Sequence, residues 1–393
     1  MASRSRPRPG GLRVRAPAGV LLCLSVGTAL YKAELARPSA FAAAGVPRRS
    51  AMALGTVVGG LSSAARAEEG TLRLKQTIAE NGLEDWTVAE YEAMRDDEPR
   101  TKAYEAAIQR RLKGIQDATV VDIGTGALAL LAIMAAKAGA KKVYAIEINP
   151  AAAQLAKKEV QKQKLQDVIE VIEGDSMQVD LPGKADLIVS ELLGSIATQE
   201  GVEPIIKDAQ KRFLKNPDGD IAAQMIPARV ETGIAPVKYT EHRIMEFAKK
   251  RGIMSRGKPE EGTLRPLRLR SKTSDLVFLS EPQTLESFDY GNPSASDAKA
   301  GVSLKFDILA NLAEQAKDFS GFAMWTRLIV DDQNVVDVKT QKMTSHWAYV
   351  VALMADKPVA LATPSSINLQ ASIDYSTRPV RYTLDMEATP AAV

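Results

Sequence analysis

The feature that most constrains this fold is a regular alternation of apolar strands and helices between residues 119 and 193. Strands are predicted at 119–123, 142–148, 168–174 and 185–193, with helices at 124–139 and 149–164. Asn149 suits the N-cap of the second helix, and Pro150 suits its first position. Strands joined by helices of this length pair in parallel. The pattern therefore predicts an α/β, Rossmann-like, doubly wound and mainly parallel sheet.

The sequence changes character after about residue 226. It becomes a series of short β-rich segments bounded by turn residues, at 229–237, 275–280, 302–309, 321–330, 346–354, 367–375 and 381–386. This pattern is typical of an antiparallel barrel or sandwich. Residues 240–275 are basic and partly helical, which indicates an arm or loop insertion. A second domain, barrel-like and antiparallel, is therefore predicted at 227–393, after a first domain at 68–226 that also holds helices from residue 87 onward.

The first 67 residues have the composition of a targeting leader. Residues 1–16 carry five Arg and no acidic residue, and an apolar run too short to span a bilayer comfortably follows at 17–30. Arg48 and Arg49 open a second apolar module, which ends in an A-x-A-like sequence at 65–67. Two modules in series predict a cleavable bipartite leader of a secondary-plastid alga, with a twin-Arg signal directed to the thylakoid. The alternative is the secretory pathway or a membrane anchor.

Without this leader the charge of the chain changes sign. The leader holds ten of the 51 basic residues and one of the 48 acidic residues, so 41 basic and 47 acidic residues remain, a net charge of −6. An acidic protein does not suit nucleic-acid binding and favours a cationic substrate. The only cysteine, Cys23, lies in the leader, and the chain has two histidines. Thiol chemistry and Cys or His metal sites are therefore not expected in the mature protein.

A glycine turn at VVDIGTG, residues 120–126, follows the first predicted strand. Glu147 ends the next strand, 21 residues after Gly126, where a carboxylate can bind both ribose hydroxyls. The dinucleotide fingerprint requires a third glycine, yet position 129 is Ala. Asp122, two residues before Gly124, suits a ligand with a cationic end, such as the amino-acid part of S-adenosylmethionine. A glycine turn in a ligand-free domain is the alternative.

Two carboxylates stand nine residues apart in SELLGSIATQE, residues 190–200. Glu191 lies at the end of a parallel strand, where open α/β sheets bind ligands. Glu200 can fold back towards it if the intervening residues form a loop. Such a buried pair requires a cation, and a guanidinium offers donors to both carboxylates at once. Alternatively, Glu191 caps the next helix and Glu200 is solvated.

Taken in order, the motifs MRDDEPRT, VVDIGTG, AKAGAKKVYAIE, SELLG…E and SHW resemble those of the protein arginine methyltransferases. The resemblance is close over about residues 85–210 and looser beyond. It implies a Rossmann-like methyltransferase domain that binds S-adenosyl-L-methionine, no metal, and in-line methyl transfer to a guanidinium nitrogen. It also implies a homodimer and an arginine-containing protein substrate, of which an Arg-Gly-rich protein is one example.

The resemblance assigns roles to particular residues. Cofactor contacts fall on Arg100, Asp122, Gly124, Gly126, Glu147, Ser176 and Met177. Arg100 would bind the carboxylate, Asp122 and Gly124 would line the methionine end, and Glu147 would bind the ribose. Ser176 and Met177 would lie against the adenine. The catalytic residues would be Glu191 and Glu200, which hold the guanidinium, and the pair Asp97 and His346, with His346 as a proton acceptor.

Each of these roles has a structural alternative, such as solvated helix charges for Arg100 and Asp97 and a buried structural histidine for His346. Two other functions stay open. One is a class I methyltransferase that acts on a small molecule. The other is a non-catalytic scaffold that keeps the fold. Cofactor binding separates the scaffold from both enzymes, and product analysis separates the two enzymes.

Overall fold

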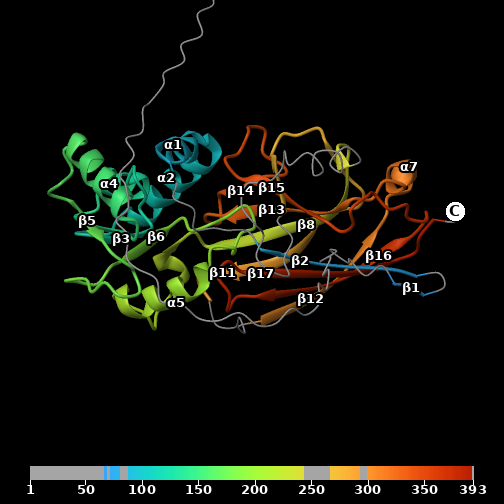
Figure 1. Ribbon diagram of the computed structural model, residues 1–393. Coiled ribbons are helices and arrows are strands. Elements are labelled where there is room, and N and C mark those ends of the chain that lie inside the picture. The colour runs from blue at the N-terminus through green and yellow to red at the C-terminus, as the bar shows by residue number, and fades with distance from the viewer. Residues whose placement is uncertain (1–65, 69–70, 80–86, 243–265, 293–298, 392–393) are drawn as a thin grey trace, which may run out of the picture. The chain divides into compact units, whose positions relative to one another are not determined.

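The structure is a computed structural model that describes residues 66–68, 71–79, 87–242, 266–292 and 299–391. Its first part is a parallel sheet, five-stranded within these residues, in the order β5-β4-β3-β6-β7. The strands are β3 (Thr119–Ile123), β4 (Lys142–Glu147), β5 (Ile169–Glu173), β6 (Leu187–Ser190) and β7 (Met225–Ile226). The helices are α1 (Val88–Asp96), α2 (Glu98–Leu112), α3 (Leu130–Lys137), α4 (Pro150–Lys162) and α5 (Val202–Phe213). The predicted Rossmann-like domain is confirmed (Figure 1).

Two predicted elements have different limits in the structure. The helix predicted from residue 124 begins only at Leu130, because Gly124, Gly126 and Ala129 have positive φ angles and form a turn. The strand predicted at 185–193 ends at Ser190, and an irregular loop carries the chain to α5. Both differences place non-helical backbone at the carboxyl ends of β3 and β6, the edge of a parallel sheet where ligands bind.

The second part consists of two antiparallel sheets. The first has the order β1-β2-β17-β16-β12, and the second has the order β10-β8-β13-β15-β9, with β11 paired to β8 and β14 paired to β13. The long strands are β2 (Thr71–Ala79), β8 (Arg229–Tyr239), β11 (Gln283–Asp289), β12 (Lys299–Asp307), β13 (Gly321–Ile329), β15 (Ala348–Leu353), β16 (Ser366–Asp374) and β17 (Arg381–Ala388). The short ones are β1 (Arg66–Glu68), β9 (Leu267–Arg270), β10 (Leu276–Phe278) and β14 (Val335–Asp337). A four-residue helix, α7 (Ala313–Ala316), precedes β13.

These two sheets share one apolar core. In β16 every second side chain is buried, as expected for a strand with one face on a core. Ile367 and Leu384 from the first sheet belong to the same buried cluster as Phe322 and Val350 from the second. The prediction of an antiparallel, barrel-like domain is therefore confirmed.

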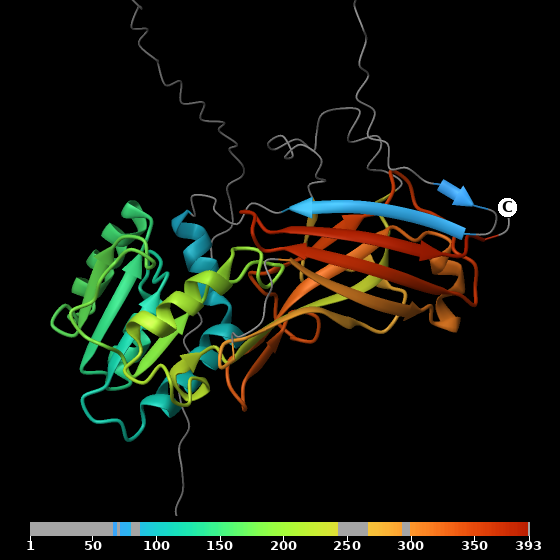
Figure 2. The same cartoon turned by 90° about the horizontal axis from the view of Figure 1, so that it is seen from below.

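β2, which lies among the residues predicted for the first domain, pairs with a strand of the antiparallel region. The sequence prediction assigns residues 68–226 to the first domain, whereas β2 pairs with β17 over eight residue pairs, from Leu72–Ala388 to Ala79–Arg381. β2 lies beside β17 in Figure 2 as well. Leu74 and Ile78 of β2 are buried in the core of the antiparallel sheets. Burial of these apolar side chains explains why β2 joins that region.

Other parts of the domain prediction stay untested. Residues 1–65 of the predicted leader lie outside the described residues, and its predicted end at residue 67 falls within β1. Residues 243–265 of the arm predicted at 240–275 also lie outside the described residues, while its last part forms β9 in the second antiparallel sheet. No helix among the described residues is long and apolar enough to cross a membrane.

Candidate active site

The glycine turn after β3 is held against the end of β4. The backbone N–H groups of Gly124 and Thr125 donate to the Ile146 carbonyl at 2.9 and 3.0 Å. The N–H of Gly126 donates to Glu147 Oε2 at 2.8 Å, and that of Asn149 donates to Glu147 Oε1 at 2.8 Å. Glu147 is thus fixed through both oxygens where two neighbouring parallel strands end.

Glycine is required at Gly126 for two reasons. Its φ angle is +66°, a region that side chains rarely adopt. A Cβ atom there would also lie 2.8 Å from Cε1 of Tyr91 on α1. The turn therefore packs closely against the ring of Tyr91.

A cavity of about 340 Å³ opens above this turn. It brings together six of the predicted site residues: Arg100, Gly124, Gly126, Glu147, Glu191 and Glu200. Its apolar walls include Met94 from α1 and Leu192 from the loop after β6. A size of this order suits a small-molecule ligand.

Asp122 lies beneath the glycine turn and does not line the cavity. It is fully buried and accepts hydrogen bonds from Thr125 Oγ1 at 2.6 Å and from the Ala132 N–H at 3.0 Å. Burial raises the pKa of Asp122 to about 7, against the opposing effect of these two donors. The residue therefore supports the turn from below, and its predicted contact with the methionine end stays a prediction.

Arg100 has a partner that the sequence did not reveal. Its Nη2 donates to Glu191 Oε2 at 2.5 Å, its Nη1 donates to the Met94 carbonyl at 3.2 Å, and both ionic side chains are buried. This chain therefore supplies one guanidinium partner of Glu191 itself, and the role of Glu191 in holding a substrate guanidinium stays a prediction. Glu191 also accepts from the Leu193 N–H at 3.2 Å, which fixes the start of the loop.

Side chains of the antiparallel region hold the loop between the two glutamates. Thr326 of β13 donates to the Gly194 carbonyl at 2.6 Å, and Trp347 donates through Nε1 to the Leu193 carbonyl at 3.1 Å. Ser195 Oγ accepts from the Ala348 N–H at 3.1 Å. The loop thus belongs to the parallel domain by sequence and is supported by the antiparallel region.

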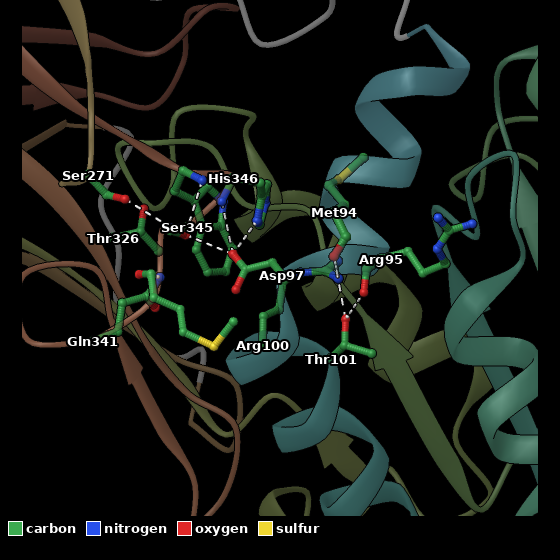
Figure 3. Close-up of polar contacts among 12 residues, drawn as sticks. Met94, Arg95, Asp97, Arg100, Thr101, Ser271, Thr326, Gln341, Ser345 and His346 are labelled. Carbon is green, nitrogen blue, oxygen red and sulfur yellow. Dashed lines mark hydrogen bonds and ion pairs between the residues drawn. The ribbon is translucent and has the colours of Figure 1, made fainter. Parts of the chain in front are cut away.

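The predicted pair of Asp97 and His346 is present between the α1–α2 junction and the segment before β15. Asp97 Oδ2 lies 2.8 Å from His346 Nδ1 and also accepts from the His346 N–H at 3.0 Å and from Ser345 Oγ at 2.8 Å (Figure 3). Burial alone would raise the pKa of Asp97, but these donors outweigh it and lower that pKa. Because an ionised carboxylate only accepts, His346 Nδ1 carries the proton.

His346 itself is held neutral. Burial lowers the pKa of its imidazole, against the opposing effect of the Asp97 hydrogen bond. Neither His346 nor Asp97 lines the cavity. Their pairing links the two parts of the molecule, and a catalytic role for either residue remains a prediction.

Ser176 and Met177 follow β5 and also lie outside the cavity lining. Ser176 is buried, and its carbonyl accepts from Arg212, whereas the Met177 side chain is 39% exposed. Nothing in this arrangement tests their assignment to the adenine.

Tyr91 and Met94 are among the cavity residues that were absent from the predicted site. Both come from α1, and their spacing of three residues places them on one helix face. Burial, together with the charges of Glu147 and Glu200, raises the pKa of Tyr91 to about 12, so its hydroxyl stays protonated. The sequence did contain a signal for the position of α1, because the capping box of Thr87 and Glu90 fixes where this helix begins.

Comparison with known proteins shows a similarity to arginine methyltransferases over part of the chain. Residues 76–221 match the family model described as PRMT5 arginine-N-methyltransferase. Over 142 residues the chain is 36% identical to protein arginine N-methyltransferase PRMT10 of Oryza sativa subsp. japonica, which covers 36% of each chain. Over this part of the chain the sequence is therefore similar to the protein arginine N-methyltransferases.

The likeness in fold to an arginine methyltransferase covers about three quarters of the chain. The crystal structure of Arabidopsis thaliana protein arginine methyltransferase 10 in an open conformation aligns with a TM-score of 0.59 at 21% identity, over 76% of this chain and 93% of that one. An arginine N(omega)-methyltransferase of Streptomyces achromogenes is 28% identical over 287 residues, 71% of this chain and 74% of that protein. The sequence match to the rice relative spans little more than a third of that relative's length.

The family match falls on the cofactor side of the site and on the loop. Residues 76–221 include the glycine turn, Glu147 and both loop glutamates, while His346 and the antiparallel sheets lie outside it, apart from part of β2. The antiparallel region, which supports the loop, therefore lies almost entirely outside the residues that match the family model.

Proposed function

We propose that this protein transfers a methyl group from S-adenosyl-L-methionine to a guanidinium nitrogen of arginine in a protein substrate. The observation that carries the proposal is the cavity itself. Glu147 and the glycine turn line the same cavity as Glu191 and Glu200. One space thus contains a carboxylate suited to a ribose and two suited to a guanidinium.

The charge of the cavity supports this combination of ligands. Its lining includes three glutamates and one arginine, a net charge of −2. S-adenosylmethionine, with a sulfonium, an ammonium and a carboxylate, carries +1, and a guanidinium adds another +1. The two ligands together would neutralise the cavity, and buried charges are costly unless they are paired.

The residues present fit the cofactor. The buried Nε–H of Arg100 has no hydrogen-bond acceptor among the described residues, so it can serve the cofactor's carboxylate. Glu147, already oriented by two backbone N–H groups, has acceptor sites left for ribose hydroxyls. When bound, the cofactor supplies an electrophilic methyl group on a positively charged sulfur.

The protein's part in the reaction is to position the substrate and receive its charge. Glu200 and Glu191 would hold the guanidinium so that one nitrogen faces the methyl carbon, and such alignment contributes up to about 7–11 kcal/mol. The carbon–sulfur bond breaks as the nitrogen–carbon bond forms, and the nitrogen then loses a proton. Free arginine is too basic to be deprotonated first. The neutral imidazole of His346 is a candidate acceptor for that proton.

The test is methyl transfer from labelled S-adenosylmethionine to an Arg-Gly-rich peptide, with product mass spectrometry. Glu200→Gln should reduce turnover on the order of a hundredfold, because a charged contact to the reacting group is lost. Cofactor affinity, measured by calorimetry, should stay within about twofold of the wild-type value. Failure to bind S-adenosylmethionine would favour the scaffold function, whereas cofactor binding without any product from arginine substrates would favour a methyltransferase that acts on a different small molecule.

A second candidate substrate is arginine as a small molecule. The Streptomyces relative, which aligns over 71% of this chain, is named for arginine rather than for protein arginine. Comparing kcat/KM for free arginine and for the peptide distinguishes the two substrates. The same products show whether methylation is single, symmetric or asymmetric.

We also propose that the protein acts as a homodimer and is imported into a plastid. The dimer rests on the family resemblance, and light scattering of the purified protein tests it. The location rests on the composition of residues 1–67. Fusion of this segment to a fluorescent protein tests it: plastid fluorescence supports import, and passage through the secretory pathway contradicts it.

A further inference from the structure

Another buried carboxylate, Glu286 of β11, stands behind the loop that carries Glu200. It is 6% exposed, and it has no basic partner among the described residues. Instead it accepts five hydrogen bonds within the described part of the chain. The donors are Thr198 N–H at 3.3 Å, Thr198 Oγ1 at 2.6 Å, Thr232 Oγ1 at 2.6 Å, Tyr375 OH at 3.0 Å and Tyr382 OH at 3.4 Å.

The strand is built to present this side chain. A register shift, or bulge, separates Thr284 from Glu286 in the pairing of β11 with β8. As a result the consecutive residues Leu285 and Glu286 are both buried, although a regular strand would expose one of them. Leu285 packs into the apolar core, and Glu286 faces the loop.

Glu286 reaches the loop at two consecutive positions. Thr198 donates to it directly through its N–H and its hydroxyl. Thr232 donates to Glu286 and accepts from the Ala197 N–H at 2.9 Å, which links the neighbouring residue indirectly. Thr198 then begins a turn that closes with the Gly201 N–H on the Thr198 carbonyl at 2.9 Å, and Glu200 lies within that turn.

We infer that Glu286 is a positioning residue for Glu200: it fixes the first residue of the turn Thr198–Gly201 and so sets where the Glu200 carboxylate stands in the cavity. This inference rests on the proposed arginine methylation. A carboxylate suits the role because it only accepts hydrogen bonds, and all five groups in contact with it are hydrogen-bond donors. Burial, with the nearby Glu286 charge, raises the pKa of Tyr375 and of Tyr382, so both hydroxyls keep the protons that they donate.

The variant Glu286→Gln keeps the size of the side chain and replaces one acceptor oxygen by a donor. It should lower kcat/KM for the arginine substrate between about tenfold and a hundredfold, because small misplacements of a positioning group have effects of this size. The dissociation constant of S-adenosylmethionine should stay within about twofold, because Glu147 and the glycine turn are held separately. If the substitution only disturbed the fold, both kcat/KM and the affinity for S-adenosylmethionine would fall.

Glu231→Gln is the matched control. Glu231 is a similarly buried carboxylate on the adjoining strand β8, but it pairs with Arg327 and with Arg229 Nε at 3.1 Å. Its removal should leave kcat/KM within about twofold. Hydrogen exchange gives a readout independent of activity: the amides of Ala197, Thr198 and Gly201 should exchange at least about tenfold faster in Glu286→Gln and at wild-type rates in Glu231→Gln.

The results separate the possible failures. Unchanged kcat/KM together with unchanged exchange at residues 197–201 in Glu286→Gln overturns the inference. If that variant does not fold, Thr198→Val is used instead, because it removes only the hydroxyl on the loop side. Thr198→Val should show the same selective loss of kcat/KM. Wild-type kinetics in Thr198→Val would also overturn the inference. If the wild-type protein methylates no arginine substrate, the proposed function fails and the exchange rates alone decide the role of Glu286.

Discussion

The contact between Arg100 and Glu191 shows how one residue can serve two parts of a site. Arg100 shares its donors between Glu191 and the Met94 carbonyl, while its Nε–H is left for another acceptor. Because both side chains are buried, either one alone would be an uncompensated charge. Glu191 is therefore oriented before any substrate arrives, and Glu200 is the glutamate that the loop itself must position.

This pair should behave as a unit in unfolding. Arg100→Met and Glu191→Gln should each lower the free energy of unfolding by about 3–5 kcal/mol, because each leaves the partner unpaired. The double variant should cost clearly less than the sum of the two single variants. Urea unfolding of the four proteins measures this coupling, and additivity within about 0.5 kcal/mol would contradict the pairing.

Asp122 should make stability depend on pH. Burial raises its pKa from the usual 3.8 to about 7 in the folded protein, so between these values the folded state holds a proton that the unfolded state has lost. This contribution is fully present below about pH 4 and disappears as the pH rises through 7. Relative to Asp122→Asn, the wild type should therefore lose free energy of unfolding from pH 4 to pH 7 and remain level above it. Parallel curves for the two proteins would exclude such a pKa.

At the scale of the element, the glycine turn illustrates what a sequence can predict. The parallel sheet, the turn and Glu147 were predictable because strand and helix periods and the residues Gly, Asn and Pro act over a few neighbours. The pairing of β2 with β17 was not, since Thr77 and Thr383, which share a hydrogen bond, are 306 residues apart. For the same reason, neither Arg100 as the partner of Glu191 nor Glu286 behind the loop could be read from spacing.

Gly126→Ala tests the turn. A left-handed φ costs a side chain roughly 1–2 kcal/mol, and the new Cβ would also press on Tyr91. Cofactor affinity should therefore fall by about tenfold or more in calorimetry. Gly139→Ala is the control, because Gly139 has a φ angle of +101° with nothing within 4 Å of a Cβ. It should lose stability with cofactor affinity unchanged, and equal loss of affinity in both variants would refute a local role for the turn.

At the scale of the whole molecule, β2 is a short segment with long-range importance. It covers β17 and buries Leu74 and Ile78. A protein that begins at residue 81 should lose roughly 3–6 kcal/mol of stability from these two side chains alone, and it exposes the edge of β17. One that begins at residue 66 should keep its melting temperature. The two proteins are compared by thermal unfolding and by the fraction of each that is soluble. Equal melting temperatures would show that β2 is dispensable.

The support of the loop by Thr326 and Trp347 has a mechanical consequence. Glu191 begins the loop beside β6, whereas the residues before Glu200 are tied to strands of the other region. Any hinge motion of the antiparallel sheets against the parallel one would pull on the middle of this loop, while β6 and α5 hold its two ends. The distance between the two carboxylates would then depend on the angle between the two regions. Binding of a partner at a distant surface would change how tightly a guanidinium is held without any contact with the cofactor.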